Sequence, residues 1–228
     1  MNLTHVTSGR SVLKAPETPT VYVVDGDATL RDTLDPILRR AGWQPRMSAS
    51  AEEFLSRPRP EVAGCLLVEL HLPGLSGLEL QRLVQDHAEM PVIFMTSHAD
   101  VQTTVAAMKA GAFEFLVKPF SHDDLMTALQ RAVERSRAAM RHLGLIRMLE
   151  QRYESLSRRE REVMSLVVTG RLNKQVGGEL GISEITVKTH RGKLMRKMQA
   201  GSFAELVSMA AQLGRGMHAS FMHSDLFA

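Results

Sequence analysis

Short, continuous runs of apolar residues alternate with helical patterns along the first half of the chain. The apolar runs lie at 20–24, 63–68, 91–95 and, more weakly, 113–117, and a segment at 44–48 fits an edge strand. Runs of this kind are typical of parallel strands that are buried on both faces. The helical patterns lie at 27–41, 51–56, 76–87 and 100–109. Because crossovers between parallel strands are right-handed, the alternation predicts an α/β fold, a doubly wound five-stranded parallel sheet with helices on both faces.

The pattern changes at Asp123, after which it is helical only. Apolar and small residues spaced by three and four run from Leu125 to Tyr153 and predict one long amphipathic helix. One interpretation is a last helix that packs on its own sheet, which explains the part up to Val133. We favour a linker helix that also pairs with a second subunit, because the pattern continues beyond the sheet and a seam of this period is what coiled coils use.

The segment 156–213 predicts a small all-α domain. Its helices are expected from the capping box of Ser157 and Glu160 to Gly170, over 173–180, over 184–198 and over 202–213. The second and third are joined by Gly-Ile-Ser, which is the arrangement of a helix-turn-helix, whose later helix lies in the major groove of DNA. No pattern continues into 214–228, and we expect this tail to be loose.

The predicted recognition helix has a buried face and a polar face. With Val187 at the centre of the buried face, the opposite face carries Ile185, Lys188, Thr189, Gly192, Lys193 and Arg196. Lysine and arginine suit guanine edges or phosphates, and threonine offers a hydroxyl or a methyl group. A solvated basic face is the plainer interpretation, but turn chemistry, capping and charge together favour double-stranded DNA as the partner.

Charge is divided unevenly along the chain. Residues 1–130 carry 11 Lys and Arg against 16 Asp and Glu, whereas residues 131–228 carry 17 against 9. A basic half joined to an acidic half indicates that one domain contacts nucleic acid and that the other does something else.

Composition excludes several other classes of protein. The single cysteine, Cys65, lies in an apolar run, so there is no internal disulfide and no multi-cysteine zinc site. No stretch approaches the roughly 18 continuous apolar residues of a membrane span, and residues 1–19 lack the apolar segment of a secretory signal. We therefore expect a cytoplasmic protein without membrane contact.

The last part of the chain resembles the LuxR-type DNA-binding domain. The shared motifs are Leu-Ser-Arg-Arg-Glu-Arg-Glu-Val-Met at 156–164, Asn-Lys-Gln-Val at 173–176, Glu-Leu-Gly-Ile-Ser at 179–183, Thr-Val-Lys-Thr-His-Arg at 186–191 and Lys-Met at 197–198. The resemblance implies that Lys188 and Thr189 face bases, with Asn173, Lys174, His190 and Lys197 nearer phosphates. The candidate DNA-binding residues are Asn173, Lys174, Thr186, Lys188, Thr189, His190, Arg191, Lys193, Arg196 and Lys197.

The first half resembles the receiver domain of the NarL/FixJ response regulators and is most similar to the FixJ branch. The shared motifs are Val-Val-Asp at 23–25, Leu-Pro-Gly-Leu-Ser-Gly-Leu-Glu-Leu at 72–80, Met-Thr at 95–96, Lys-Ala-Gly-Ala at 109–112 and Lys-Pro-Phe at 118–120. The resemblance implies an aspartate that accepts phosphate, two acids that hold magnesium, and a threonine and a lysine that grip the phosphoryl oxygens. It also implies a cis peptide at Lys118-Pro119. The acceptor-position and switch residues in this chain are Glu69, Asp25, Gly26, Thr96, Phe115 and Lys118.

Two of these positions depart from the family pattern. Glu69 stands where the family has the acceptor aspartate, and Gly26 stands where it has the second acid. An extra methylene moves a carboxylate by more than about 1 Å, and in-line phosphoryl transfer depends on placement at that tolerance. Loss of an acid removes a ligand from magnesium, which demands octahedral oxygen geometry. We therefore expect an atypical receiver with no cofactor, in which Glu69 supplies a permanent negative charge to Lys118.

Two alternatives for the acidic pocket remain. In one, Asp27 moves into the vacant role and Glu69 still accepts phosphate, as in an ordinary phosphorylation-dependent regulator. In the other, the acids are plain remnants of a pocket.

The sequence as a whole predicts five segments. They are a flexible segment over 1–19, a flavodoxin-like receiver domain over 20–135, a linker helix over 136–152, a LuxR-type helix-turn-helix domain over 153–213 and a loose tail over 214–228.

We expect a DNA-binding transcription regulator and not an enzyme. A hydrolase would use the same acidic cleft, but no nucleophile with an adjacent base is present by motif. A protein-interaction module that has lost DNA binding is the other competing class. The expected partners are double-stranded DNA, a second copy in a homodimer, RNA polymerase and, where phosphorylation operates, a sensor histidine kinase.

Overall fold

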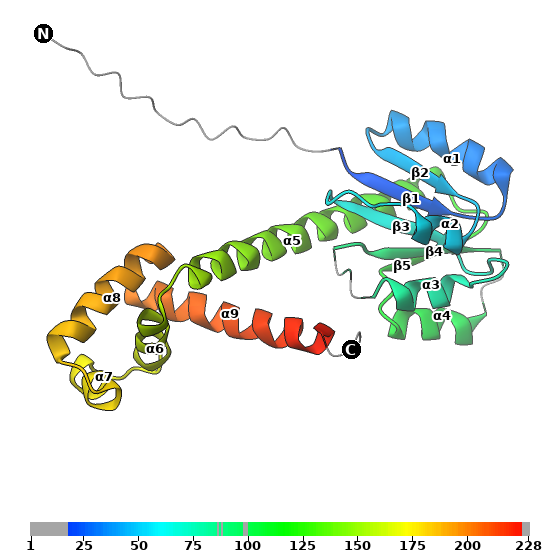
Figure 1. The fold of residues 1–228 in the computed structure, drawn as a ribbon. Helices are drawn as coiled ribbons and strands as arrows, with labels where there is room; N and C mark the ends of the chain where they lie inside the picture. Colours follow the sequence, from blue (N-terminus) through cyan, green and yellow to red (C-terminus); the bar gives the residue numbers. More distant parts are fainter. Residues whose placement is uncertain (1–17, 86, 88, 98–99, 225–228) are drawn as a thin grey trace, which may run out of the picture. The chain divides into compact units, whose positions relative to one another are not determined.

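The chain divides into two compact units, Met1–Met140 and Arg141–Ala228. The computed structural model describes residues 18–85, 87, 89–97 and 100–224, with side chains as far as residue 214 (Figure 1). Most of the predicted N-terminal segment, 1–17, and the end of the tail, 225–228, lie outside the described residues. A single helix, α5 (His122–Glu154), contributes residues to both units.

The first unit is the predicted doubly wound α/β domain. Its strands are β1 (Thr20–Val24), β2 (Gln44–Ser48), β3 (Gly64–Glu69), β4 (Val92–Thr96) and β5 (Glu114–Val117). Its helices are α1 (Ala28–Arg40), α2 (Ala51–Ser56), α3 (Gly77–Leu83), α4 (Val101–Lys109) and the start of α5. All neighbouring strands pair in parallel, in the order β2-β1-β3-β4-β5, which confirms the predicted sheet and its edge strand β2 (Figure 1).

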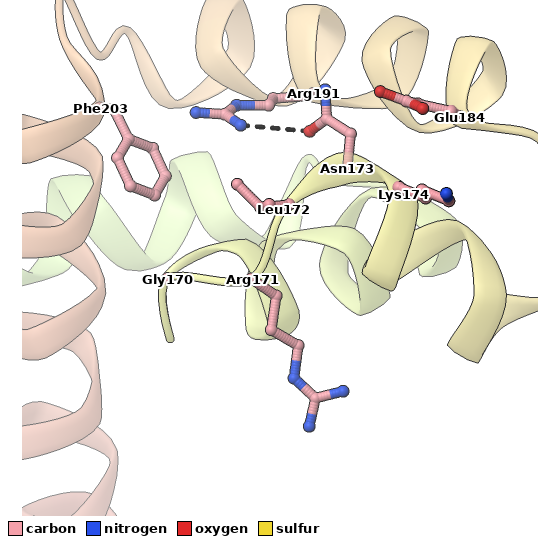
Figure 2. A pocket seen from close by; sticks show the side chains of 8 residues that line it. All are labelled: Gly170, Arg171, Leu172, Asn173, Lys174, Glu184, Arg191 and Phe203. Atoms are coloured by element: carbon pink, nitrogen blue, oxygen red, sulfur yellow. Dashed lines mark hydrogen bonds between the residues drawn. The ribbon is translucent and has the colours of Figure 1, made fainter.

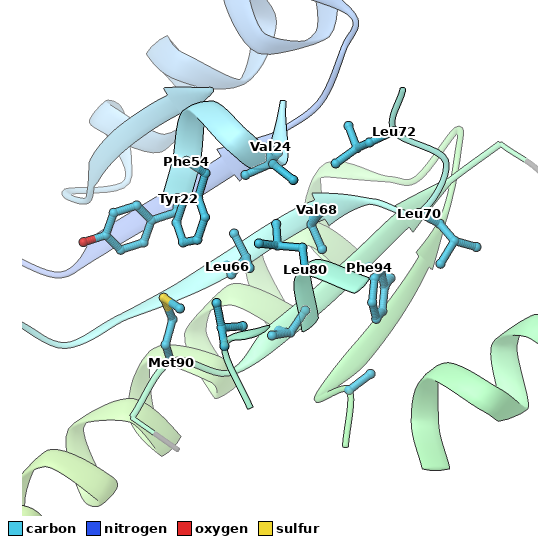
Figure 3. Close-up of a cluster of buried hydrophobic side chains, with 14 of the residues drawn as sticks. Tyr22, Val24, Phe54, Leu66, Val68, Leu70, Leu72, Leu80, Met90 and Phe94 are labelled. Carbon is cyan, nitrogen blue, oxygen red and sulfur yellow. The ribbon is translucent and has the colours of Figure 1, made fainter. Parts of the chain in front are cut away.

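Both faces of the sheet are covered, because alternate residues of each central strand point to opposite sides. On one face Tyr22, Val24 and Phe94 pack with α2, α3 and α4, as Figure 3 shows for most of this cluster. On the other face Val21, Val23 and Ile93 pack with α1 and with α5. Truncation of a fully buried aromatic side chain such as Phe94 to alanine typically costs about 3–5 kcal/mol of stability.

Cys65 belongs to the second of these clusters. It is fully buried, and burial raises the pKa of its thiol to about 12. A buried thiol with a raised pKa is a packing residue of the strand rather than a reactive thiol.

Side-chain caps begin the helices that surround the sheet. Asp27 caps α1 by accepting hydrogen bonds from the backbone of Thr29 and Leu30, and Ser76 forms a capping box with Glu79 at α3. Such caps typically contribute about 1 kcal/mol each. Asp27 is therefore a structural residue of the first turn of α1.

The second unit is helical. After the end of α5 it contains α6 (Arg158–Val167), α7 (Asn173–Leu180), α8 (Glu184–Met198) and α9 (Phe203–Ser224). The predicted capping box of Ser157 and Glu160 is present. A core that includes Leu149, Val163, Val187 and Leu206 holds these helices to the end of α5.

The expectation of a loose tail from residue 214 was wrong as far as Ser224. Helix α9 continues through Gly214 to Ser224 instead of ending at Leu213. Glycine lowers helix propensity by about 1 kcal/mol but does not remove a backbone donor, and no proline interrupts residues 203–224. A glycine therefore weakens this helix without ending it.

Within the described part of the chain, no helix has the length and apolar character needed to cross a membrane.

Candidate functional site

Four chemically active side chains meet at the carboxyl ends of the sheet strands. Asp25 follows β1 directly, Glu69 ends β3, Thr96 ends β4, and Lys118 follows β5. Because all strands are parallel, these ends lie along one edge of the sheet, which is where doubly wound folds place their functional sites.

Lys118 holds the two acids of this pocket together. Its Nζ donates a hydrogen bond to Asp25 Oδ2 at 2.7 Å and to Glu69 Oε2 at 2.5 Å. Burial by itself lowers the pKa of the Lys118 ammonium, but its hydrogen bonds to Asp25 and Glu69 and their charges outweigh burial, so the pKa is raised. Lys118 therefore stays charged at neutral pH and neutralises part of the acidic pocket.

The remaining carboxylate oxygens also have partners. Asp25 Oδ1 accepts a hydrogen bond from the backbone N–H of Asp27 at 2.8 Å, and Glu69 Oε1 accepts one from the backbone N–H of His71 at 3.1 Å. Charged acceptors of this kind are stabilised by about 1.5–3 kcal/mol per hydrogen bond. Both carboxylates are therefore held in place by the protein itself.

His71 is a pocket residue that the sequence did not indicate. Its Nδ1 lies 3.3 Å from Thr96 Oγ1 and 4.0 Å from Glu69 Oε1. The contact joins the loop after β3 to the end of β4. No motif marks His71, because its role depends on the pairing of the two strands rather than on its neighbours in sequence.

Gly26 leaves open space beside the pocket. A Cβ placed on Gly26 would meet only Pro73 Cδ, at 3.9 Å, and the residue is exposed. A side chain fits at this position without displacing its neighbours. The fold would therefore tolerate the acid that the family has at this position, although this chain has glycine.

The donor groups of this pocket do not fit the magnesium ion that the resemblance implies. Asp25 and Glu69 each bind Lys118, Gly26 offers no side chain, and Asp27 uses its carboxylate to cap α1. Among the described residues, no group of three or more His, Cys, Asp or Glu side chains is arranged to hold a metal ion. Magnesium needs near-octahedral oxygen coordination, which these residues do not provide.

Phe115 and the residues after β5 complete the pocket region. Phe115 is half-buried and its ring centroid lies 6.2 Å from that of Phe94, with the rings tilted by 45°. The Lys118-Pro119 peptide is cis, as the resemblance implied.

The second candidate site is the helix-turn-helix formed by α7 and α8. Gly181 adopts a left-handed conformation, with φ of 66°, that ends α7, and Ser183 caps α8 by accepting a hydrogen bond from the N–H of Thr186. Val187, Leu194 and Met198 are fully buried. The exposed residues of α8 include Ile185, Lys188, Thr189, Gly192, Lys193 and Arg196.

Several of the predicted DNA-binding residues have partners within the unit. Arg191 donates a hydrogen bond to Asn173 Oδ1 at 3.2 Å, and its guanidinium lies 4.5 Å from the ring centroid of Phe203. Arg191, Asn173, Phe203 and Lys174 line a hollow of about 430 Å³. Figure 2 shows these residues and the hydrogen bond between Arg191 and Asn173. Arg191 therefore links the start of α7 to α8 and α9.

Two further hydroxyls bind the helix itself. Thr186 Oγ1 lies 2.8 Å from Ser183 Oγ, and Thr189 Oγ1 donates to the carbonyl of Ile185 at 3.0 Å. The Thr189 methyl group and the two acceptor lone pairs of its hydroxyl stay available to a ligand. His190 is half-buried at the edge of the helix.

Lys197 forms an ion pair within the unit, although its side chain is 40% exposed. Its Nζ donates to Glu160 Oε2 at 2.7 Å and to the carbonyl of Ser155 at 3.0 Å, and the Glu160 side chain is almost fully buried. Contact of Lys197 with phosphate stays a prediction, and the structure adds that this lysine is paired with Glu160. The capping box marks Glu160 as a structural residue in the sequence. It does not indicate Lys197 as the partner of Glu160, because the two residues are 37 positions apart.

A doubly wound domain with this pocket, followed by a helix-turn-helix, defines the class of DNA-binding regulators that carry a receiver domain. Residues 21–130 match the response regulator receiver domain, and residues 154–210 match the luxR family of bacterial regulatory proteins.

Similar proteins cover nearly the whole chain. Nodulation protein W of Bradyrhizobium diazoefficiens is 44% identical over 195 residues, which are 85% of this chain and 86% of that protein. The transcriptional regulatory protein FixJ of the same organism is 37% identical over 85% of this chain and 95% of its own length. The solved structure of the response regulator StyR covers 86% of this chain and 99% of its own, with 41% identity and a TM-score of 0.75. The chain belongs to the FixJ/NarL-type family of DNA-binding two-component response regulators.

Proposed function

We propose that this response regulator controls transcription without being switched by phosphorylation. The observation that carries the proposal is the Lys118 ammonium, bound at once to Asp25 and to Glu69, with Glu69 at the acceptor position. In this chain the carboxylate that binds Lys118 at the acceptor position is one methylene longer than that of an aspartate, and it carries its negative charge without phosphorylation. The charge at the acceptor position of the receiver domain is then constant.

Geometry at the acceptor position supports this. The Glu69 carboxylate extends one methylene further than an aspartate would, and both of its oxygens accept hydrogen bonds from the protein. Nucleophilic attack on a phosphoryl group requires an oxygen placed to within about 1 Å on the line of displacement, and these hydrogen bonds hold the Glu69 carboxylate in another position. Glu69 is therefore poorly suited to accept phosphate.

The glycine at position 26, where the family has its second acid, also argues against phosphorylation. Gly26 contributes no oxygen, and Asp27 would have to give up its hydrogen bonds with the N–H groups of Thr29 and Leu30 to replace it. Loss of such a cap costs about 1 kcal/mol, in addition to the movement of the start of α1. Recruitment of Asp27 as a metal ligand is therefore disfavoured.

The second candidate is an ordinary phosphorylation-dependent regulator. It is favoured by Asp25, Thr96 and Lys118, which match the family at three pocket positions, and by the receiver domain, which implies a histidine kinase partner. This candidate requires that Lys118 release Glu69 and that a magnesium ion bind with one acid fewer.

Phosphate uptake separates the two candidates. The full chain is incubated with acetyl phosphate and magnesium, and its intact mass is measured. We expect no added phosphoryl group for the natural chain and one for the double variant Glu69→Asp with Gly26→Asp, which restores both the reach of the nucleophile and the missing ligand. Glu69→Gln with Gly26→Asp is the matched control that regains the ligand without a nucleophile, and it should stay unmodified. One phosphoryl group on the natural chain would contradict the proposal.

The proposal also includes the partners of the chain. We infer that the chain acts on double-stranded DNA as a homodimer in the cytoplasm, that it influences RNA polymerase at its target promoters, and that it is not an enzyme. Its relatives are transcription regulators, and the acidic pair that a hydrolase would need is occupied by Lys118. A shift of labelled duplex at low salt would distinguish it from a module that has lost DNA binding.

A further inference from the structure

Ile185 is an apolar side chain in an unusual place. It is 80% exposed, the highest fraction among the large hydrophobic side chains that the structure describes, and it is the second residue of α8. Lys188 and Thr189 lie three and four positions later, on the same side of the helix, and both are exposed. An isoleucine thus stands among the groups that face away from the core.

The fold of the domain does not require this side chain. The core of α8 is made by Val187, Leu194 and Met198, and its first turn is closed by Ser183, whose hydroxyl accepts from the N–H of Thr186 at 3.1 Å. β-Branched residues lower helix propensity, and the first turn favours acidic and polar groups. Ile185 therefore contributes little to folding and is free to contact a partner.

The position of Ile185 indicates which partner this is. In a helix-turn-helix, the first residues of the second helix reach base edges in the major groove. The apolar group that a standard base pair presents there is the 5-methyl group of thymine. A β-branched side chain on a helix is nearly fixed at χ1, so its methyl groups have a defined position.

The neighbours of Ile185 on α8 support a close approach to DNA. Lys188 and Lys193 are exposed cations that suit guanine edges or phosphates. Gly192 has open space around it, because a Cβ built there would meet nothing within 4 Å. A basic surface with one apolar side chain at its leading end fits a groove that contains an A·T pair.

We infer that Ile185 is a specificity-determining residue that contacts the 5-methyl group of a thymine in the DNA site. The inference rests on DNA binding by this domain and is independent of whether the receiver is phosphorylated. It assigns to Ile185 a role in the choice of sequence, while Lys188 provides polar base contact.

The test compares thymine with uracil, which lacks only the methyl group. Sites are selected from a random duplex library with the full natural chain, and each thymine of the selected site is replaced in turn by deoxyuridine. We expect one position at which the replacement weakens binding by about fourfold, the effect of removing one buried methyl group. Ile185→Ala should bind the two duplexes equally, whereas Ile185→Val, which keeps the branched carbon, should retain a preference for thymine.

Lys188→Ala is the matched control. It should bind more weakly overall but keep the thymine preference, because it leaves Ile185 in place. The inference is overturned if no thymine is sensitive to the replacement, or if Ile185→Ala keeps the same ratio of affinities. It is also overturned if Ile185→Ala binds every duplex as the natural chain does and loses only transcription, which would indicate a protein partner. If the natural chain bound no duplex at all, that result would instead contradict DNA binding by this domain.

Discussion

Two lysines on the same helix have different surroundings. Lys188 is exposed and has no ion pair among the residues that the structure describes, whereas Lys197 is paired with the nearly buried carboxylate of Glu160. Both lysines are exposed, but of the two only Lys197 neutralises a nearly buried carboxylate. Burial by itself raises the pKa of Glu160, but the Lys197 ammonium and the Ser157 N–H outweigh it and lower the pKa.

This difference predicts that two alanine substitutions affect different properties, one the stability of the fold and the other DNA binding. Lys197→Ala should lower the free energy of unfolding by about 1–3 kcal/mol, because it leaves a nearly buried carboxylate without its cation. Lys188→Ala should leave stability unchanged, weaken specific DNA binding by about 1–3 kcal/mol and relax the preference only at the base that Lys188 contacts. Urea denaturation and duplex titration measure the two quantities.

The pH dependence of stability provides a second measurement of the same pair. A carboxylate whose pKa is lowered by folding stabilises the fold fully above its unfolded value, 4.5, and that contribution is lost as the pH falls through the folded pKa. Lys197→Ala should therefore flatten the loss of stability below that pH. Equal stability of the two variants, with an equal and uniform loss of DNA affinity, would instead assign Lys197 to phosphate contact.

At the scale of an element, α5 has three parts with different surroundings. Leu125, Leu129 and Val133 are buried in the first unit, and Leu149 is buried in the second. Between them the predicted seam continues through Met140, Leu143 and Ile146, none of which is buried. The described residues leave this part of the seam without cover, and it is the part that a second copy of α5 would cover.

A pair of matched variants tests this role of α5. Leu143 and Leu145 are both 38% exposed, but only Leu143 lies on the seam, because two positions along a helix turn a side chain by about 200°. Leu143→Asp should shift the protein from dimer to monomer, since it places a carboxylate in an apolar contact, and Leu145→Asp should leave the dimer intact. Light scattering at micromolar concentration measures both. A natural chain that is monomeric there, and that binds DNA as a monomer, would contradict the pairing.

Elements whose sequence carries a strong local signal were predicted well. β1, β2, α2, α7 and α8 begin and end at the predicted residues, because apolar runs, caps and glycine turns define their ends. Local signals failed for the end of α9, where glycine weakens a helix without ending it, and for α3, which ends at Leu83 although the apolar pattern continues.

For the candidate sites, too, local signals predicted some residues and not others. The positions of Asp25, Glu69 and Lys118 followed from strand ends and motif, since parallel strands bring their carboxyl ends together. The contacts of His71 with Thr96 and of Lys197 with Glu160 could not be predicted, because each joins residues far apart in sequence whose meeting depends on tertiary packing.

At the scale of the whole molecule, the proposed absence of phosphorylation limits how the receiver can affect DNA binding. A ligand or modification shifts an equilibrium between two states only by its differential affinity for them. In an ordinary regulator the phosphoryl group provides that difference at Thr96 and Lys118. In this chain Lys118 is bound to Glu69 and Asp25, and under the proposed function this fixed charge would set the bias of the receiver in place of a phosphoryl group.

DNA affinity of the natural chain should therefore be the same with and without acetyl phosphate and magnesium. The double variant Glu69→Asp with Gly26→Asp should acquire a dependence on acetyl phosphate, because it regains an acceptor and a metal ligand while Thr96 and Lys118 are unchanged. Fluorescence anisotropy with one labelled duplex, at constant ionic strength, measures both chains, since magnesium salts alone weaken phosphate contacts. Glu69→Gln is the informative control: it removes the fixed charge, so its DNA affinity should differ from that of the natural chain while staying independent of acetyl phosphate. Tighter binding by the natural chain after uptake of one phosphate would return this protein to the kinase-driven members of its family.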